Sequence, residues 1–257
     1  MDREDTSAPE ITYDLGLLAK SEEKWSKSAA LRFLYGDLYR EMAERMVPGS
    51  TLELGSGIGR IKDFLPGVVT SDLVKTPYVD QACSAYDIDP PEEGQWANIL
   101  ALDVLHHLCR PFDFFASASR TLAPGGRIIL VEPAATPFGR LFYKAVHPEP
   151  IEPSRIQPPF VMEPDSPDGE FANMGMGVAL FRQHEGETAE RLRPLELRPL
   201  SVSFRDFAAY PLTGGYAGKQ LAPKLLIQGL AAMEHLLPQA LLRILGLRMV
   251  VALEKVL

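Results

Sequence analysis

The chain has 257 residues, of which 46% are hydrophobic and 23% charged, a composition that excludes disordered and fibrous proteins. Its formal net charge of −8 provides no global positive field, so we expect no nucleic-acid partner. The two cysteines, Cys83 and Cys109, have no paired spacing and no Cys/His ligand cluster is evident, so we expect neither a disulfide framework nor a structural zinc site, and no metal. These features favour a soluble protein of the reducing cytoplasm.

The N-terminus is acidic and lacks the basic and apolar regions of a signal peptide. Export therefore has no support in the sequence. Residues 1–20 are polar with few apolar residues, and we expect them to form a flexible leader, followed by a single domain over residues 21–257. Since no stretch reaches the roughly 18 apolar residues that a membrane span needs, we expect no stable membrane association.

Apolar residues recur at helical spacing from Ser21 to Met46 and predict one or two helices, which would form a helical cover over residues 21–49. A short buried strand is expected at 51–54, followed by a glycine turn and a short helix at 60–65. Further strands are expected at 68–71, 79–84, 97–102 and 126–131, and a helix at 111–122. This alternation predicts a largely parallel α/β sheet with a core at residues 50–133.

Prolines crowd between Pro133 and Pro167, which indicates an irregular insertion, so we expect residues 134–196 to form a lid that completes a substrate pocket. In residues 197–257, two more strands are expected at 198–205 and 248–254, on either side of a helical stretch at 222–245. The leucine-rich segment 221–247 could be a membrane-surface helix, but its short polar face favours burial against the sheet or against the partner in a homodimer.

The strongest motif is the run from Leu52 to Arg60, in which Gly55, Gly57 and Gly59 follow a predicted strand. Glycine allows a sharp turn and lets a ligand approach main-chain N–H groups. A small ligand is therefore expected at this turn. The dinucleotide fingerprint G-x-G-x-x-G is not matched, because its sixth position is Arg60.

Residues 50–133 resemble the class I S-adenosylmethionine-dependent methyltransferases. The first motif of that family is an acidic residue followed by G-x-G-x-G, here Glu53 with the three glycines. The other matching segments are Asp72 after the second strand, Ala85-Tyr86-Asp87, residues 102–108 and residues 122–133. The chain looks most like the methyltransferase type 11 branch, whose bacterial members continue through Glu132-Pro133 into a turn like that at 147–150.

The resemblance implies a Rossmann-like, doubly wound, mostly parallel seven-stranded sheet with its last strand antiparallel, and S-adenosyl-L-methionine as the cofactor. It assigns cofactor binding to Glu53, Gly55, Ser56, Gly57, Gly59, Asp72, Ala85, Tyr86, Leu102 and Asp103. In that assignment Glu53 supports the ammonium group, Asp72 holds the ribose, and Ala85 with Tyr86 borders the adenine. Asp72 lies closer to the glycine motif than is usual, which predicts a trimmed first helix.

His106 and His107 follow the fourth predicted strand, at the edge where open α/β sheets bind ligands. His106 is therefore a candidate general base, although packing beneath the cofactor is an equally simple role. His147 lies between prolines in the insertion and is a second candidate, with a solvated turn as the alternative.

The predicted reaction is methyl transfer to an oxygen, nitrogen or carbon atom of a small, partly hydrophobic acceptor. Because the sulfonium already activates the methyl group, positioning in a dry pocket supplies much of the effect. Two alternatives stay open: a non-catalytic cofactor-binding scaffold or sensor, and a nicotinamide-dependent oxidoreductase.

Overall fold

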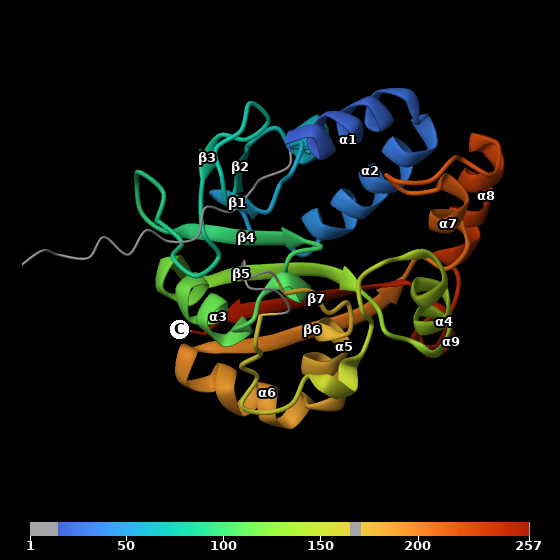
Figure 1. Cartoon of the computed structure of the whole chain (residues 1–257). Helices are drawn as coiled ribbons and strands as arrows, with labels where there is room; N and C mark the ends of the chain where they lie inside the picture. Colours follow the sequence, from blue (N-terminus) through green and yellow to red (C-terminus); the bar gives the residue numbers. More distant parts are fainter. Residues whose placement is uncertain (1–14, 165–170, 257) are drawn as a thin grey trace, which may run out of the picture.

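A computed structural model describes residues 15–164 and 171–256 of the chain. Within these ranges the strands form one seven-stranded sheet in the order β3-β2-β1-β4-β5-β7-β6 (Figure 1). The strands are β1 (Thr51–Leu54), β2 (Val68–Asp72), β3 (Gln81–Ala82), β4 (Trp96–Leu102), β5 (Leu122–Pro133), β6 (Leu197–Arg205) and β7 (Arg248–Lys255). β7 runs antiparallel to β5 and β6, and the other neighbouring strands are parallel. The predicted mixed sheet with an antiparallel last strand is confirmed.

Alternate residues of the central strands face two different cores. Ile128 and Leu130 of β5 belong to one cluster of buried side chains, whereas Ile129 and Val131 belong to another on the opposite face. Because side chains of a strand alternate between faces, a run of buried apolar residues predicts a strand covered on both sides.

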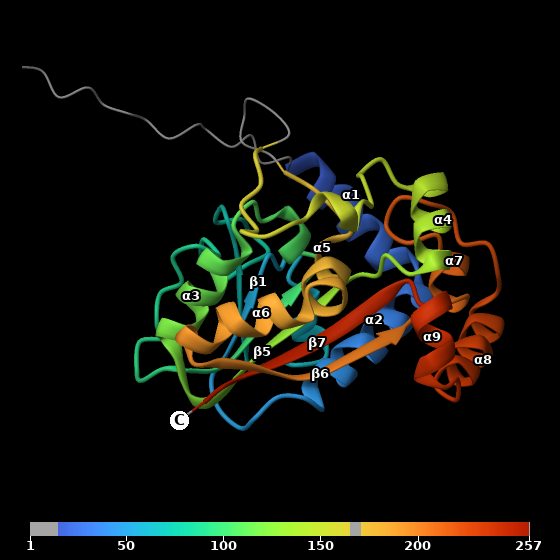
Figure 2. The ribbon, with the colours of Figure 1, turned by 90° about the horizontal axis from the view of Figure 1, so that it is seen from below.

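Helices cover both faces of the sheet. α1 (Leu15–Lys27) and α2 (Ala29–Ala43) lie on one face, and α3 (Pro111–Thr121), α5 (Met176–Val178) and α6 (Glu185–Leu192) lie on the other (Figure 2). α2 starts at Ala29, within the range where one or two helices were predicted, because the Ser28 hydroxyl accepts a hydrogen bond from the backbone N–H of Leu31. The leader expected over residues 1–20 is too long, since α1 already begins at Leu15; residues 1–14 lie outside the described part.

The short spacing after the glycine turn has the predicted consequence. A single 3₁₀ turn, Arg60–Asp63, replaces a full helix between β1 and β2. This turn still buries Ile61 in the core beneath α1 and α2.

Only part of the insertion at 134–196 is free to act as the predicted lid, because its second half belongs to the core. After α4 (Pro137–Val146) and an irregular loop, the segment 171–192 packs into the main core beside the sheet, with Met174, Leu180 and Phe181 buried. These side chains cover one face of the sheet, so this half of the insertion stabilises the fold.

The leucine-rich segment forms two helices, α8 (Lys224–Glu234) and α9 (Gln239–Leu245), after the short α7 (Ala209–Thr213). Ile227 and Ala231 of α8 pack against α2, while Leu225 and Leu236 are 81% and 84% exposed. The segment was expected to pack against the sheet or against a dimer partner. Within the chain, α8 packs against α2 and not against the sheet, whereas α9 does pack beside β6, with Leu242 in the main core. No helix in the described residues is long and apolar enough to cross a membrane.

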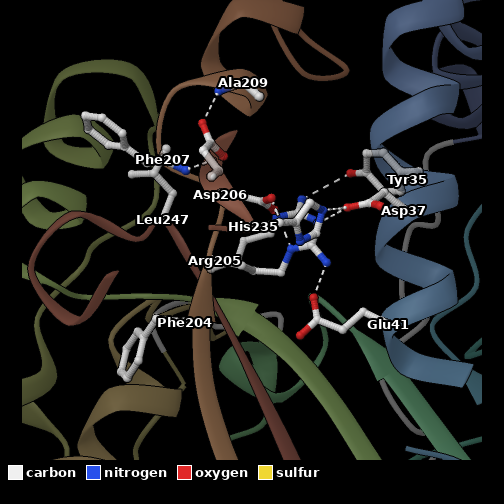
Figure 3. A network of polar contacts seen from close by, with 12 residues as sticks. Tyr35, Asp37, Glu41, Phe204, Arg205, Asp206, Phe207, Ala209, His235 and Leu247 are labelled. Carbon is white, nitrogen blue, oxygen red and sulfur yellow. Dashed lines mark hydrogen bonds and ion pairs between the residues drawn. The ribbon is translucent and has the colours of Figure 1, made fainter. Parts of the chain in front are cut away.

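A buried cation joins α2 to the edge of the sheet (Figure 3). The Arg205 guanidinium is buried and donates hydrogen bonds to Asp206 at 3.0 Å and to Asp37 at 2.9 Å, and it also pairs with Glu41. Asp37 lies 2.8 Å from Nε2 of His235, which caps α8. One guanidinium thus compensates carboxylates from α2 and from the end of β6.

We predict that Arg205→Ala lowers the free energy of unfolding by about 3 kcal/mol, because it leaves the buried Asp206 without its cation and removes one of the cations that pair with Asp37 and Glu41. Urea denaturation measures this loss. The control is Arg198→Ala, which breaks an exposed pair with Glu254 on the same strand and should cost less than about 1 kcal/mol. Equal losses in the two variants would contradict a special role for the buried cation.

Candidate cofactor-binding site

The glycine motif forms a tight turn at the carboxyl end of β1. Gly55 and Gly59 have φ angles of 63° and 65°, which favour glycine. A Cβ on Gly55 would lie 2.5 Å from Cγ2 of Val104, and one on Gly59 would lie 2.2 Å from the carbonyl oxygen of Tyr78. These two glycines are therefore required by packing as well as by conformation.

A cavity of about 810 Å³ opens beside the turn. Five of the residues predicted to bind a cofactor line it: Gly55, Asp72, Ala85, Tyr86 and Asp103. Each Asp72 oxygen accepts one backbone hydrogen bond, Oδ2 from Gly57 at 2.9 Å and Oδ1 from Leu73 at 2.8 Å. Since a carboxylate oxygen can accept two hydrogen bonds, each Asp72 oxygen can still accept one hydrogen bond from a hydroxyl group of a vicinal diol.

A second cavity, of about 190 Å³, lies on the other side of the turn. The predicted residues Gly55, Ser56, Gly57, Leu102 and Asp103 line it, together with three aromatic residues, Tyr35, Tyr39 and Tyr216. Gly59 lines neither cavity, so its role is to shape the turn. Gly55 and Asp103 line both cavities, which places the two hollows side by side.

Two carboxylates near the glycine turn have unused oxygen atoms: that of Asp103, which lines both cavities, and that of Glu53, which lines neither. Oε2 of Glu53 and Oδ1 of Asp103 are buried and have no hydrogen-bond partner within the described residues. Burial raises the pKa of Glu53 to about 7; a hydrogen bond from Ser56 opposes this shift and the charge of Asp72 adds to it. Burial also raises the pKa of Asp103, against the charge of Arg248. A cationic ligand group would satisfy both carboxylates.

The sequence analysis missed the cation that holds Asp103. Arg248, the first residue of β7, is buried and donates a hydrogen bond to Oδ2 of Asp103 at 3.1 Å. Its guanidinium lies over the rings of Tyr210 and Tyr35, at 4.5 and 5.2 Å from their centroids. No local signal marks this pair, since it joins residues far apart in the sequence.

The segment after β4 is anchored by Glu132, which is fully buried near the end of β5. Oε1 accepts the backbone N–H groups of Val104 and Leu105 at 3.0 and 2.7 Å. Oε2 lies 3.3 Å from the backbone nitrogen of His106 and 2.6 Å from its ring Nδ1. The Glu132 carboxylate therefore fixes both the course of this segment and the orientation of the His106 ring.

The surroundings of His106 do not favour the predicted role of general base, which stays a prediction. Burial alone would lower the pKa of His106, but the charges and hydrogen bonds of Glu132 and Glu149 raise it to about 10. An imidazolium cannot take a proton, and His106 is 3% exposed and outside both cavities. The neighbouring His107 lines the large cavity instead, and its pKa is lowered by desolvation and by the charge of His106.

His147 also lies outside the two cavities. It is exposed at the end of α4, where Nδ1 accepts a hydrogen bond from the backbone N–H of Glu149 at 3.3 Å. From the insertion, Met162 and Pro164 do reach the large cavity. The insertion thus contributes part of one wall.

Comparisons with known proteins agree with this architecture. Neither a family model nor a curated protein matches the chain. A SAM-dependent methyltransferase of Archaeoglobus fulgidus is similar in structure, with 13% identity, a TM-score of 0.51 and coverage of 91% of this chain and 97% of that chain. One of Thermotoga maritima has 13% identity and a TM-score of 0.53, over 92% and 95% of the two chains.

The fold is therefore that of the class I S-adenosylmethionine-dependent methyltransferases, as the sequence predicted. At this low identity the likeness concerns the fold. The more specific assignment to the type 11 branch stays a prediction.

We predict that Gly55→Ala destabilises the protein more than Gly94→Ala does. Both glycines have a positive φ, so both variants carry backbone strain of about 1–2 kcal/mol. Only the Cβ at position 55 meets a neighbour, whereas at Gly94 nothing lies within 4 Å. The overpacking adds about 1–3 kcal/mol, which denaturant unfolding of the two variants measures. Equal losses would show that the contact with Val104 relaxes without cost.

Proposed function

We propose that the chain binds S-adenosyl-L-methionine at the glycine turn and transfers its methyl group to an oxygen, nitrogen or carbon atom of a small, partly hydrophobic acceptor. The observation that carries this proposal is the pair of adjoining cavities, one large and mostly apolar with Asp72 in its wall, the other small with two unsatisfied carboxylates near it. A ligand with an adenosine part and an ammonium group fits both.

The residues present suit each part of the cofactor. Asp72 would accept hydrogen bonds from the ribose hydroxyls, and Ala85 with Tyr86 would border the adenine. Glu53 would compensate the ammonium group, since Ser56, whose hydroxyl donates a hydrogen bond to the Glu53 carbonyl oxygen at 3.2 Å, lines the small cavity. When bound, the cofactor supplies an electrophilic methyl group.

The chain's own contribution to the reaction would be mainly positioning and exclusion of water. Tyr35, Tyr39 and Tyr216 wall the small cavity, and α1 lies across it with Leu18 and Ser21. Aromatic walls favour an acceptor with apolar surface. Since His106 lies outside both cavities, we propose no proton transfer through it, and in-line placement of the acceptor carries the reaction.

Two other functions remain as alternatives. A non-catalytic cofactor-binding scaffold would have the same cavities and the same affinity for the cofactor, and only turnover separates it from an enzyme. A nicotinamide-dependent oxidoreductase is disfavoured, because the glycine turn leads into a 3₁₀ turn at Arg60 and not into a full helix. The cytoplasmic location, the absence of a nucleic-acid partner and a homodimer likewise stay predictions.

The first of two predictions that test the proposed function concerns Asp72. Calorimetric titration of the wild-type protein with S-adenosylhomocysteine should show binding, and titration with NAD should not. Asp72→Ala should weaken binding at least about tenfold, because charge-assisted hydrogen bonds contribute roughly 1.5–3 kcal/mol. Glu92→Ala, which removes an exposed carboxylate outside both cavities, is the control. Unchanged affinity in Asp72→Ala would refute the ribose assignment.

The second prediction concerns pH. Because the pKa of Glu53 is raised to about 7 in the free protein, most of this group is neutral at pH 6 and ionised at pH 8. The ammonium group prefers the ionised form, so affinity for S-adenosylhomocysteine should rise about tenfold from pH 6 to pH 8. Glu53→Gln should bind with an affinity that is flat over this range. A rise of the same size in the variant would assign the pH dependence to another group.

A further inference from the structure

Three metal-binding side chains meet beside the large cavity, from segments that are distant in the sequence. His106 and His107 follow β4, and Glu149 lies in the loop after α4. Their ligand atoms all lie within 4.8 Å of one another. In the described residues, no other group of three or more histidine, cysteine, aspartate or glutamate side chains lies this close together. The methyltransferase proposal gives this cluster no role.

The ring of His106 is oriented as metal-binding histidines are. Its Nδ1 donates a hydrogen bond to Oε2 of Glu132 at 2.6 Å, which directs Nε2 to the other side of the ring. There Nε2 faces Oε2 of Glu149 at 3.5 Å. A buried carboxylate behind a histidine ligand is the usual second shell of a protein metal site.

His107 is held in the form that a metal ion needs. Its Nδ1 lies 3.3 Å from the carbonyl oxygen of Phe171, which can only accept a hydrogen bond, so Nδ1 carries the hydrogen. The lone pair is then on Nε2. The two histidine rings lie together, with centroids 4.1 Å apart.

The separation of the ligand atoms also fits a metal ion. Bonds of about 2.0–2.2 Å at tetrahedral angles place two ligand atoms about 3.3 Å apart, close to the 3.5 Å between His106 and Glu149. Oε2 of Glu149 is buried and has no hydrogen-bond partner among the described residues. This oxygen is therefore available as a ligand.

Charge favours a divalent ion over a proton at this place. Glu132 and Glu149 bring two negative charges to the His106 ring, and Glu132 is fully buried. A proton on His106 compensates one of these charges, whereas a divalent cation compensates both, and buried charge is stable only when it is paired.

We propose that His106, His107 and Glu149 bind a divalent first-row transition-metal ion such as Zn²⁺, Mn²⁺, Fe²⁺ or Co²⁺, with Glu132 as the positioning residue for His106. Two imidazoles and one carboxylate suit these ions better than Mg²⁺ or Ca²⁺, which prefer oxygen ligands alone. Three protein ligands leave at least one coordination position open. Because His107 also lines the large cavity, the ion lies at the edge of that cavity.

The site differs from what the sequence predicted, which was no metal site. His106 and His107 are adjacent in the sequence, but a neighbouring pair alone is not a metal motif. Only the fold adds the third ligand from residue 149 and the buried carboxylate from residue 132.

The test uses the untagged full-length protein, treated with a chelator and then titrated with CoCl₂ while the visible absorption of the ion is recorded. We expect one equivalent of Co²⁺ to bind, Zn²⁺ to displace it and MgCl₂ to leave the spectrum unchanged. His107→Ala and Glu149→Gln should each weaken Co²⁺ binding at least about tenfold. Both side chains reach the surface, so these variants should keep the fold, as circular dichroism will show.

The matched control is His235→Asn, which removes an exposed histidine paired with Asp37, away from the cluster. It should bind Co²⁺ as the wild-type protein does. Absence of Co²⁺ binding, or equal binding by the wild type and both ligand variants, would overturn the proposal and leave His106 as an imidazolium between two carboxylates. Because no cofactor is used, this result is independent of the S-adenosylhomocysteine titration.

Discussion

The buried carboxylate of Glu132 is the constraint on which the functional half of the molecule depends. It lies in β5, yet it accepts backbone hydrogen bonds from the segment that follows the neighbouring strand β4 and also contacts the ring of His106. A carboxylate buried this completely is stable only when its oxygens are fully satisfied. Glu132 therefore fixes the course of the backbone in the segment after β4. Residues of this segment line the large cavity and supply two of the three side chains of the metal-ligand cluster.

That course explains the position of Asp103. The residue has a φ of 57°, an unusual conformation for a side chain other than glycine, and it stands between the end of β4 and the anchored segment. Its carboxylate is thereby held at the junction of the two cavities, where Arg248 of β7 meets it. Of the non-glycine residues with a positive φ in the described part of the chain, Asp103 is the one that lines these cavities.

Unsatisfied negative charge is the common feature of the proposed sites. Glu53, Asp103 and Glu149 each bury an oxygen without a hydrogen-bond partner in the described part of the chain. Elsewhere in the same structure buried carboxylates are paired, as around Arg205 (Figure 3). Asp103 does pair with Arg248, and Glu149 lies near His106, but neither contact hydrogen-bonds the oxygen concerned. Under the two proposals, cationic ligands would satisfy these oxygens: an ammonium group at Glu53 and Asp103, and a metal ion at Glu149.

The sequence by itself determined the strands, the glycine turn and the carboxylate at Asp72, because these depend on local spacing: apolar runs, glycines after a strand and an acidic residue at the end of the next strand. It could not decide that Glu132 orients the His106 ring, that segment 171–192 is core, or that Arg248 holds Asp103. Those properties arise from contacts between residues that are distant along the chain. Burial and electrostatic pairing set the charge of a side chain, and only the tertiary structure determines both.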